Sequence, residues 1–206
     1  MTEAPPQQLP RGRHRLSREE VEQSQRSRML LALAMAMTEN GYVGTSVADV
    51  IKRAGVGRET FYQQFSSKLD CFMSAFDTAG AMLLGRIEQT AGDARGTPLE
   101  RFDRALSAYL DVLAEQPAVA RVFLVEVYAA GPEALAHRAA LQDRIVAATA
   151  DLLGARSEES RFACQVLVAA VSNMVTGPVI AQDAKALRGL RPKIVHLVER
   201  AMELDP

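Results

Sequence analysis

Cysteine is scarce in this chain of 206 residues, which contains only Cys71 and Cys164. Neither has the spacing of a zinc ligand, so the sequence predicts no metal centre. Both fall on helix faces that are otherwise apolar, and packing in the core is the main interpretation. Redox sensing by one of them is the alternative.

Residues arranged for catalysis are also lacking. His14, His137 and His196 lie far apart, and no neighbouring nucleophile or carboxylate spacing suggests a catalytic triad. The sequence has no glycine-rich loop of the phosphate-binding type. Because residues distant in sequence can meet in space, a helical enzyme stays a minor alternative. We expect no enzymatic activity and no cofactor.

Long apolar runs are missing as well. No apolar stretch approaches about 18 residues, and the first residues lack the hydrophobic segment of a signal peptide. With 48% hydrophobic and 24% charged residues, the composition is that of an ordinary soluble protein. These features predict a cytoplasmic protein with one core or two small ones.

The alternation of apolar and polar residues that marks β-strands does not occur. Every periodic segment beyond Asp70 has helical spacing, so the sequence predicts an all-α protein. Glycine and proline mark the breaks, and Pro98, Pro117 and Pro132 stand where a first-turn proline costs no hydrogen bond. Helices are expected at 67–91, 98–116, 117–130, 132–155, 158–177 and 186–204.

Positive charge is scarce overall, but it is concentrated near the amino terminus. The formal net charge is −1, yet residues 11–68 contain 10 Lys and Arg against 6 Asp and Glu. This excess predicts a phosphate-facing surface in the first third of the chain. Residues 1–16 form a basic, proline-containing arm that is either disordered and solvated or in contact with DNA phosphates or the minor groove.

Two short helices joined by a glycine turn are predicted between Thr45 and Lys68. Ser46 and Asp49 fit a capping box at the start of the first helix, and Gly55 can adopt the left-handed backbone that ends it. The apolar stripe of this helix consists of Val47, Val50, Ile51 and Ala54.

The second of these helices has an apolar inner face and a polar outer face. Phe61 and Phe65 lie four residues apart on the inner face, so Glu59 and Gln63 point almost directly away from them. A helix-turn-helix with outward arginine, amide, carboxylate and phenol groups suits a DNA major groove. A helical hairpin with a merely solvated polar face is the alternative.

The run from Arg26 to Phe76 resembles the amino-terminal DNA-binding domain of the TetR family of bacterial transcriptional regulators. The residues that carry the resemblance are Gly41-Tyr42, Thr45-Ser46-Val47, Ala54-Gly55-Val56, Thr60-Phe61-Tyr62, Phe65 and Lys68. Gly57 departs from the family pattern, which usually has serine or another capping residue there. The resemblance implies a DNA-binding domain at 17–70 and a helical ligand-binding and dimerisation domain at 71–206.

The outward residues have different expected roles on DNA. Arg58 and Gln63 are the main candidates for base edges, because arginine pairs well with guanine and glutamine with adenine. Glu59 and Gln64 are weaker candidates for the same role. Geometry and the family pattern together assign phosphate contacts to Thr45, Thr60, Tyr62 and Lys68.

The segment 158–177 is apolar nearly all round, so it needs cover on both sides. Its cover is either its own bundle or a second chain, and the resemblance favours a homodimer formed by the helices at 158–177 and 186–204. The expected partner is a pseudo-palindromic DNA operator.

Aromatic residues and thioethers of the second domain suit a cavity for a small, largely apolar effector. The expected function is therefore a ligand-responsive regulator, most simply a repressor that its effector releases from DNA. A regulator without an effector and a transcriptional activator are the alternatives. The predicted ligand-binding residues are Phe72, Phe76, Phe102, Leu106, Tyr109, Phe123, Glu126, Asn173 and Met174.

Overall fold

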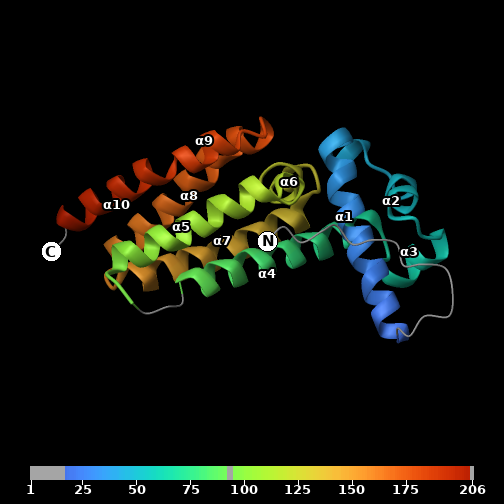
Figure 1. The fold of residues 1–206 in the computed structure, drawn as a ribbon, viewed down its shortest axis with the longest axis horizontal. Helices are drawn as coiled ribbons and strands as arrows, with labels where there is room; N and C mark the ends of the chain where they lie inside the picture. Colours follow the sequence, from blue (N-terminus) through green and yellow to red (C-terminus); the bar gives the residue numbers. More distant parts are fainter. Residues whose placement is uncertain (1–16, 92–94, 205–206) are drawn as a thin grey trace. The chain divides into compact units, whose positions relative to one another are not determined.

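The computed structural model describes residues 17–91 and 95–204, and within these ranges every regular element is a helix (Figure 1). The all-α prediction is confirmed. The chain forms two compact units, of which the first ends at Asp77 and the second begins at Thr78. The predicted basic arm at 1–16 lies outside the described residues.

The first unit begins with helix α1, Arg18–Gly44. Ser17 caps it in a reciprocal arrangement: its hydroxyl accepts from the Glu20 amide, and the Glu20 carboxylate accepts from the Ser17 amide. Gly41 interrupts the helix with a φ of 68°, a conformation that favours glycine.

The predicted helix-turn-helix consists of α2, Val47–Ala54, and α3, Arg58–Gln64. The capping box of Ser46 and Asp49 is present, and Gly55 ends α2 with left-handed backbone at φ 64° and ψ 40°. Val50 and Ala54 of α2 and Phe61 of α3 are buried. Both the capping and the apolar pattern were therefore readable from sequence.

Helix α4, Lys68–Ala91, starts after Ser67, whose hydroxyl accepts from the Asp70 amide. The helix contributes Lys68–Asp77 to the first unit and the remainder to the second.

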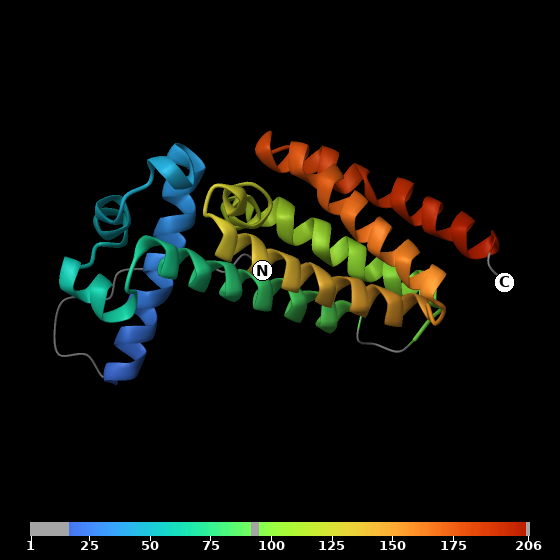
Figure 2. The same cartoon turned by 180° about the vertical axis from the view of Figure 1, so that it is seen from behind.

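The second unit consists of the rest of α4 and six further α-helices with one short 3₁₀ helix among its described residues. In both views α5, α7 and α8 run alongside one another (Figures 1 and 2). The elements are α5 Pro98–Glu115, α6 Pro117–Leu124, η1 Glu126–Tyr128, α7 Pro132–Leu153, α8 Glu158–Ile180, α9 Ala184–Gly189 and α10 Arg191–Leu204.

Three of the predicted helix boundaries were wrong. The helix expected at 117–130 leaves helical backbone at Val125, and the following turn is 3₁₀. The helix expected at 186–204 divides at Leu190, because Pro192 has no amide to continue the hydrogen bonding and instead stands in the first turn of α10. Helix α8 passes through Pro178 and ends at Ile180.

Helix α8 is long and apolar enough to cross a membrane when judged by length and composition alone. Scattered polar residues such as Ser172 and Asn173 interrupt the apolar run of α8 without lowering its mean hydropathy much, so the sequence shows no long apolar stretch. Only 22% of its most apolar 18-residue window is buried. A helix of this kind needs a further covering surface.

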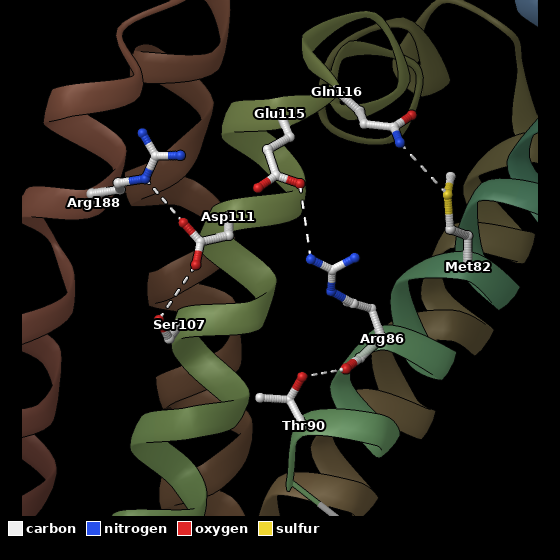
Figure 3. A network of polar contacts seen from close by, with 8 residues as sticks. All are labelled: Met82, Arg86, Thr90, Ser107, Asp111, Glu115, Gln116 and Arg188. Carbon is white, nitrogen blue, oxygen red and sulfur yellow. Dashed lines mark hydrogen bonds and ion pairs between the residues drawn. The ribbon is translucent and has the colours of Figure 1, made fainter. Parts of the chain in front are cut away.

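Polar contacts tie the outer helices to α5 (Figure 3). Arg188 of α9 donates from Nε to Asp111 Oδ1 at 2.9 Å, whereas Arg86 of α4 lies 4.0 Å from the Glu115 carboxylate. The second pair is half exposed and at the limit of an ion pair, so it holds α4 only weakly. Asp103 and Arg191 form a closer, two-point pair between α5 and α10.

Candidate DNA-binding and ligand-binding sites

Helix α3 presents a polar surface opposite a buried aromatic face. Phe61 is completely buried and Phe65, which follows the helix, is 1% exposed. Arg58, Glu59 and Gln63 are exposed, as is the Tyr62 ring, at 46%. The buried rings thus fix the rotation of the helix and direct its polar residues outward.

The outward side chains of α3 hold one another only loosely. The Gln63 amide lies 3.4 Å from the Glu59 carboxylate, at the long end for a hydrogen bond. The Arg58 guanidinium carbon lies 5.5 Å from the centre of the Tyr62 ring. Because the contacts between Gln63 and Glu59 and between Arg58 and Tyr62 are weak, these polar groups can reorient onto base edges or phosphates at little cost.

Lys68 has an internal role that the sequence interpretation missed. Its ammonium donates to the Tyr42 and Thr45 carbonyls at 2.8 and 2.9 Å and lies 4.2 Å from the centre of the Tyr42 ring. Partial burial lowers its pKa. The carbonyls at the end of α1 account for this cation in the first turn of α4, whereas its predicted phosphate contact stays a prediction.

Thr45 is also placed differently from its predicted role. It is only 2% exposed, and its hydroxyl donates to the Gly41 carbonyl at 2.7 Å. Its amide points to the Gly41 and Tyr42 carbonyls. Both donors of Thr45 are therefore used inside the protein, and its phosphate contact stays a prediction.

Two arginines of α1 serve other helix ends in the same way. Arg26 reaches the Gln64 carbonyl at 3.4 Å and the Ser74 hydroxyl at 2.9 Å, and Arg28 donates to the Ala54 carbonyl at 2.8 Å. Together with Lys68, these cations meet the carboxyl ends of α1, α2 and α3. Part of the positive charge counted near the amino terminus is thus engaged by backbone carbonyls within the first unit.

The second unit contains a largely apolar cavity of about 150 Å³ lined by α4, α5, α6, α7 and α8. Four of the predicted ligand-binding residues line it: Phe102, Leu106, Tyr109 and Phe123. Helix α4 adds Leu83, Leu84 and Ile87.

A few polar groups interrupt the apolar lining. Arg138 donates to the Ser172 hydroxyl at 3.0 Å and to the Gln142 amide oxygen at 3.3 Å, and all three residues line the cavity. Tyr109 lines it as well, and burial raises the pKa of its hydroxyl. The sequence interpretation missed Arg138, because its helix, α7, is rich in alanine and offered no clear motif.

The other five predicted ligand-binding residues do not line the cavity. Phe72 and Phe76 are buried in the first unit, where Phe72 packs edge-on against Tyr42. Glu126 is 4% exposed, and its carboxylate accepts from Arg121 at 2.8 Å. Asn173 and Met174 lie on the exposed side of α8. The spacing of apolar residues identifies apolar helix faces, but it does not show whether such a face lies in the core, lines a cavity or is exposed.

Residues 30–75 match the model of the family described as bacterial regulatory proteins, tetR family. This range contains α2, α3 and their outward residues. Residues 30–75 form a TetR-family DNA-binding domain. The chain is accordingly a DNA-binding transcriptional regulator and not an enzyme.

Known TetR-family proteins are similar over most of this chain. The HTH-type transcriptional activator FasR from Mycolicibacterium smegmatis is 25% identical over 163 residues, which are 76% of this chain and 71% of FasR. The fatty acid degradation regulator FadR from Bacillus halodurans superposes with a TM-score of 0.75 at 21% identity, covering 84% of this chain and 93% of FadR. FadR from Bacillus subtilis, solved in complex with stearoyl-CoA, superposes with a TM-score of 0.70 at 22% identity. This match covers 82% of this chain and 95% of that FadR.

Large apolar side chains are exposed on the last long helices of the chain. On α8, Phe162 is 64% exposed and Val166 is 51% exposed; on α10, Leu197 is 62% exposed.

Both cysteines, Cys71 and Cys164, are buried. Burial raises the pKa of the Cys71 thiol to about 12. A thiol with so high a pKa carries almost no thiolate at neutral pH, which argues against redox sensing by Cys71.

Proposed function

We propose that this TetR-family regulator is a cytoplasmic homodimer that represses transcription by binding a pseudo-palindromic operator. The dimer leaves the operator when a small, largely apolar effector binds. The observation that carries the proposal is the pairing of an outward polar face on α3 with an apolar cavity in the second unit. A dimer would place its two α3 helices in successive major grooves, about one helical turn apart.

In this proposal Arg58 and Gln63 read base edges, with Glu59 and Gln64 in lesser roles. Thr60 and Tyr62 contact phosphates. The exposure of Arg58, Glu59, Tyr62 and Gln63 supports these assignments. Lys68 and Thr45 act indirectly, by holding the end of α1 against the start of α4.

Helix α4 is the element through which the effector would act. Its first turns belong to the first unit, and its later residues Leu83, Leu84 and Ile87 line the cavity. An effector that displaces α4 would alter the separation of the paired α3 helices. DNA and effector would then weaken each other by the same factor, and a coupling of about 1–3 kcal/mol would suffice for regulation.

The test is operator binding with and without an effector. Genomic fragments retained by the protein would identify the operator, and a thermal-shift screen of apolar compounds would identify effectors, since a ligand at 100 times its dissociation constant stabilises a protein by about 2.7 kcal/mol. We expect the effector to lower operator affinity about 5- to 150-fold. A compound that binds in the cavity and leaves operator affinity unchanged would disprove release by effector.

Activation of transcription is the second candidate, because the relative FasR is named as an activator. A reporter gene behind the identified operator separates the two. Reporter output falls on expression of a repressor and rises on expression of an activator.

A further inference from the structure

The cavity of the second unit has a cationic group at its edge. The Arg138 guanidinium contacts Ser172 and Gln142, which line the cavity, and its carbon lies 5.1 Å from the centre of the Tyr128 ring. That ring is 58% exposed. The charge therefore lies where the apolar interior meets solvent.

Arg138 has no carboxylate partner within the described part of the chain. Its two hydrogen-bond acceptors, the Gln142 amide oxygen and the Ser172 hydroxyl, are both neutral. A guanidinium has five N–H donors, so three stay available. A positive charge beside an apolar wall gains most from an anion, and arginine binds carboxylates through two parallel hydrogen bonds.

The Tyr109 hydroxyl is a second polar group of the cavity. It makes no hydrogen bond within the described ranges 17–91 and 95–204. Burial raises its pKa and the Arg138 charge opposes this, so the two groups are within electrostatic reach of each other. A buried tyrosine hydroxyl normally has a partner, and a bound acceptor would supply one.

We propose that the effector is an amphiphilic carboxylate whose acid group binds Arg138 and whose apolar part fills the cavity beside Leu106 and Phe123. This inference rests on the proposed effector pocket and assigns the chemical class of its ligand. The volume of about 150 Å³ is that of a cavity which holds one benzene ring. Acids of about six carbons are therefore suitable probes.

The experiment compares hexanoate, 1-hexanol and hexylamine, which share a chain and differ in head group. Each competes with a neutral fluorescent apolar dye for the full-length protein at pH 7. We expect hexanoate to bind at least about tenfold more tightly than hexanol, the effect of a hydrogen-bonded charge. Hexylamine should bind most weakly. The preference for hexanoate should disappear in Arg138→Met and shrink in Ser172→Ala, which removes one support of the guanidinium.

The matched control is Arg144→Met, which removes an exposed arginine of the same helix outside the cavity and should keep the preference. Thermal melts of all variants verify folding, and Ser172→Ala tests the idea if Arg138→Met does not fold. Hexanol binding as tightly as hexanoate would overturn the carboxylate assignment and leave the effector pocket standing. Failure of every probe to displace the dye, or to bind at all, would overturn both.

Discussion

Single residues in the first unit divide into those that face outward and those that hold helix ends. Gln63 and Lys68 illustrate the division, although both were predicted to contact DNA. Gln63 is exposed and has one long hydrogen bond to Glu59. Lys68 is bonded to two carbonyls. Substitutions at these positions should therefore affect different properties.

Replacing Gln63 by alanine should change the base preference of the protein without changing its stability. The loss of a good base contact costs about 1–3 kcal/mol at the preferred site. Binding to a randomised operator library, followed by sequencing, measures the preference. Gln89→Ala on the exposed side of α4 is the matched control. An unchanged preference in the Gln63 variant would remove this residue from the base-reading set.

Replacing Lys68 by methionine should lower the free energy of unfolding by about 1–2 kcal/mol, since two carbonyls lose a charged donor. Methionine keeps the length of the side chain and removes the ammonium. Chemical denaturation measures the effect, with exposed Lys52→Met of α2 as the control. A Lys68 variant that stays stable but binds DNA with a salt dependence lower by about one unit would instead support the predicted phosphate contact.

At the scale of helices, ion pairs of different quality join the elements of the second unit. Arg191 of α10 donates to both carboxylate oxygens of Asp103 on α5, at 2.6 and 2.7 Å. These hydrogen bonds hold the pKa of Asp103 below its ordinary value. The Arg86–Glu115 pair of α4 and α5 reaches only 4.0 Å (Figure 3).

Asp103→Asn should destabilise the protein by up to about 1 kcal/mol at pH 7, a value limited by the partial exposure of the pair. Because the folded-state pKa is lowered, this contribution is complete above the unfolded pKa of about 3.9 and is lost as the pH falls through the folded value. Chemical denaturation at pH 7 and below pH 4 measures the free energy of unfolding of both proteins. The difference between wild type and Asp103→Asn should be smaller below pH 4 than at pH 7. The control is Asp143→Asn, at an exposed position of α7, which should leave the free energy of unfolding unchanged at both pH values. A difference that persists at the acid end would contradict an ionic origin.

For the whole molecule, the exposed apolar residues of α8 and α10 predict association. Val166→Glu combined with Leu197→Glu would place charges on the surfaces proposed to meet in the dimer. Light scattering should give roughly twice the 22.4 kDa chain mass for the wild type and the single mass for the variant. The variant should also lose tight operator binding, because one α3 helix reads only half of the site.

Val43→Glu is the control for the double variant. Val43 is 81% exposed and belongs to the first unit, whereas α8 and α10 belong to the second. It should leave the mass unchanged. A double variant that still has the dimer mass would exclude these two side chains from the dimer contact.

The sequence by itself determined the features that depend on local pattern. Capping residues such as Ser46 and the left-handed turn at Gly55 act within one helix turn, so they were visible without neighbours. The same holds for the inward rings of Phe61 and Phe65, which set the outward face of α3. The helix-turn-helix and the all-α fold were therefore predictable.

Only the tertiary structure decided which residues share a site. The sequence alone allowed Lys68 to contact a phosphate. The fold brings it to the Tyr42 and Thr45 carbonyls, 26 and 23 residues away in sequence, where it holds a helix end. Phe76 and Phe102 were equally suitable for a cavity, yet only Phe102 lines one. Arg138 meets Ser172 across 34 residues, a contact that no local spacing encodes. Helical periodicity specifies which side of a helix is buried, whereas packing between helices determines what that side contacts.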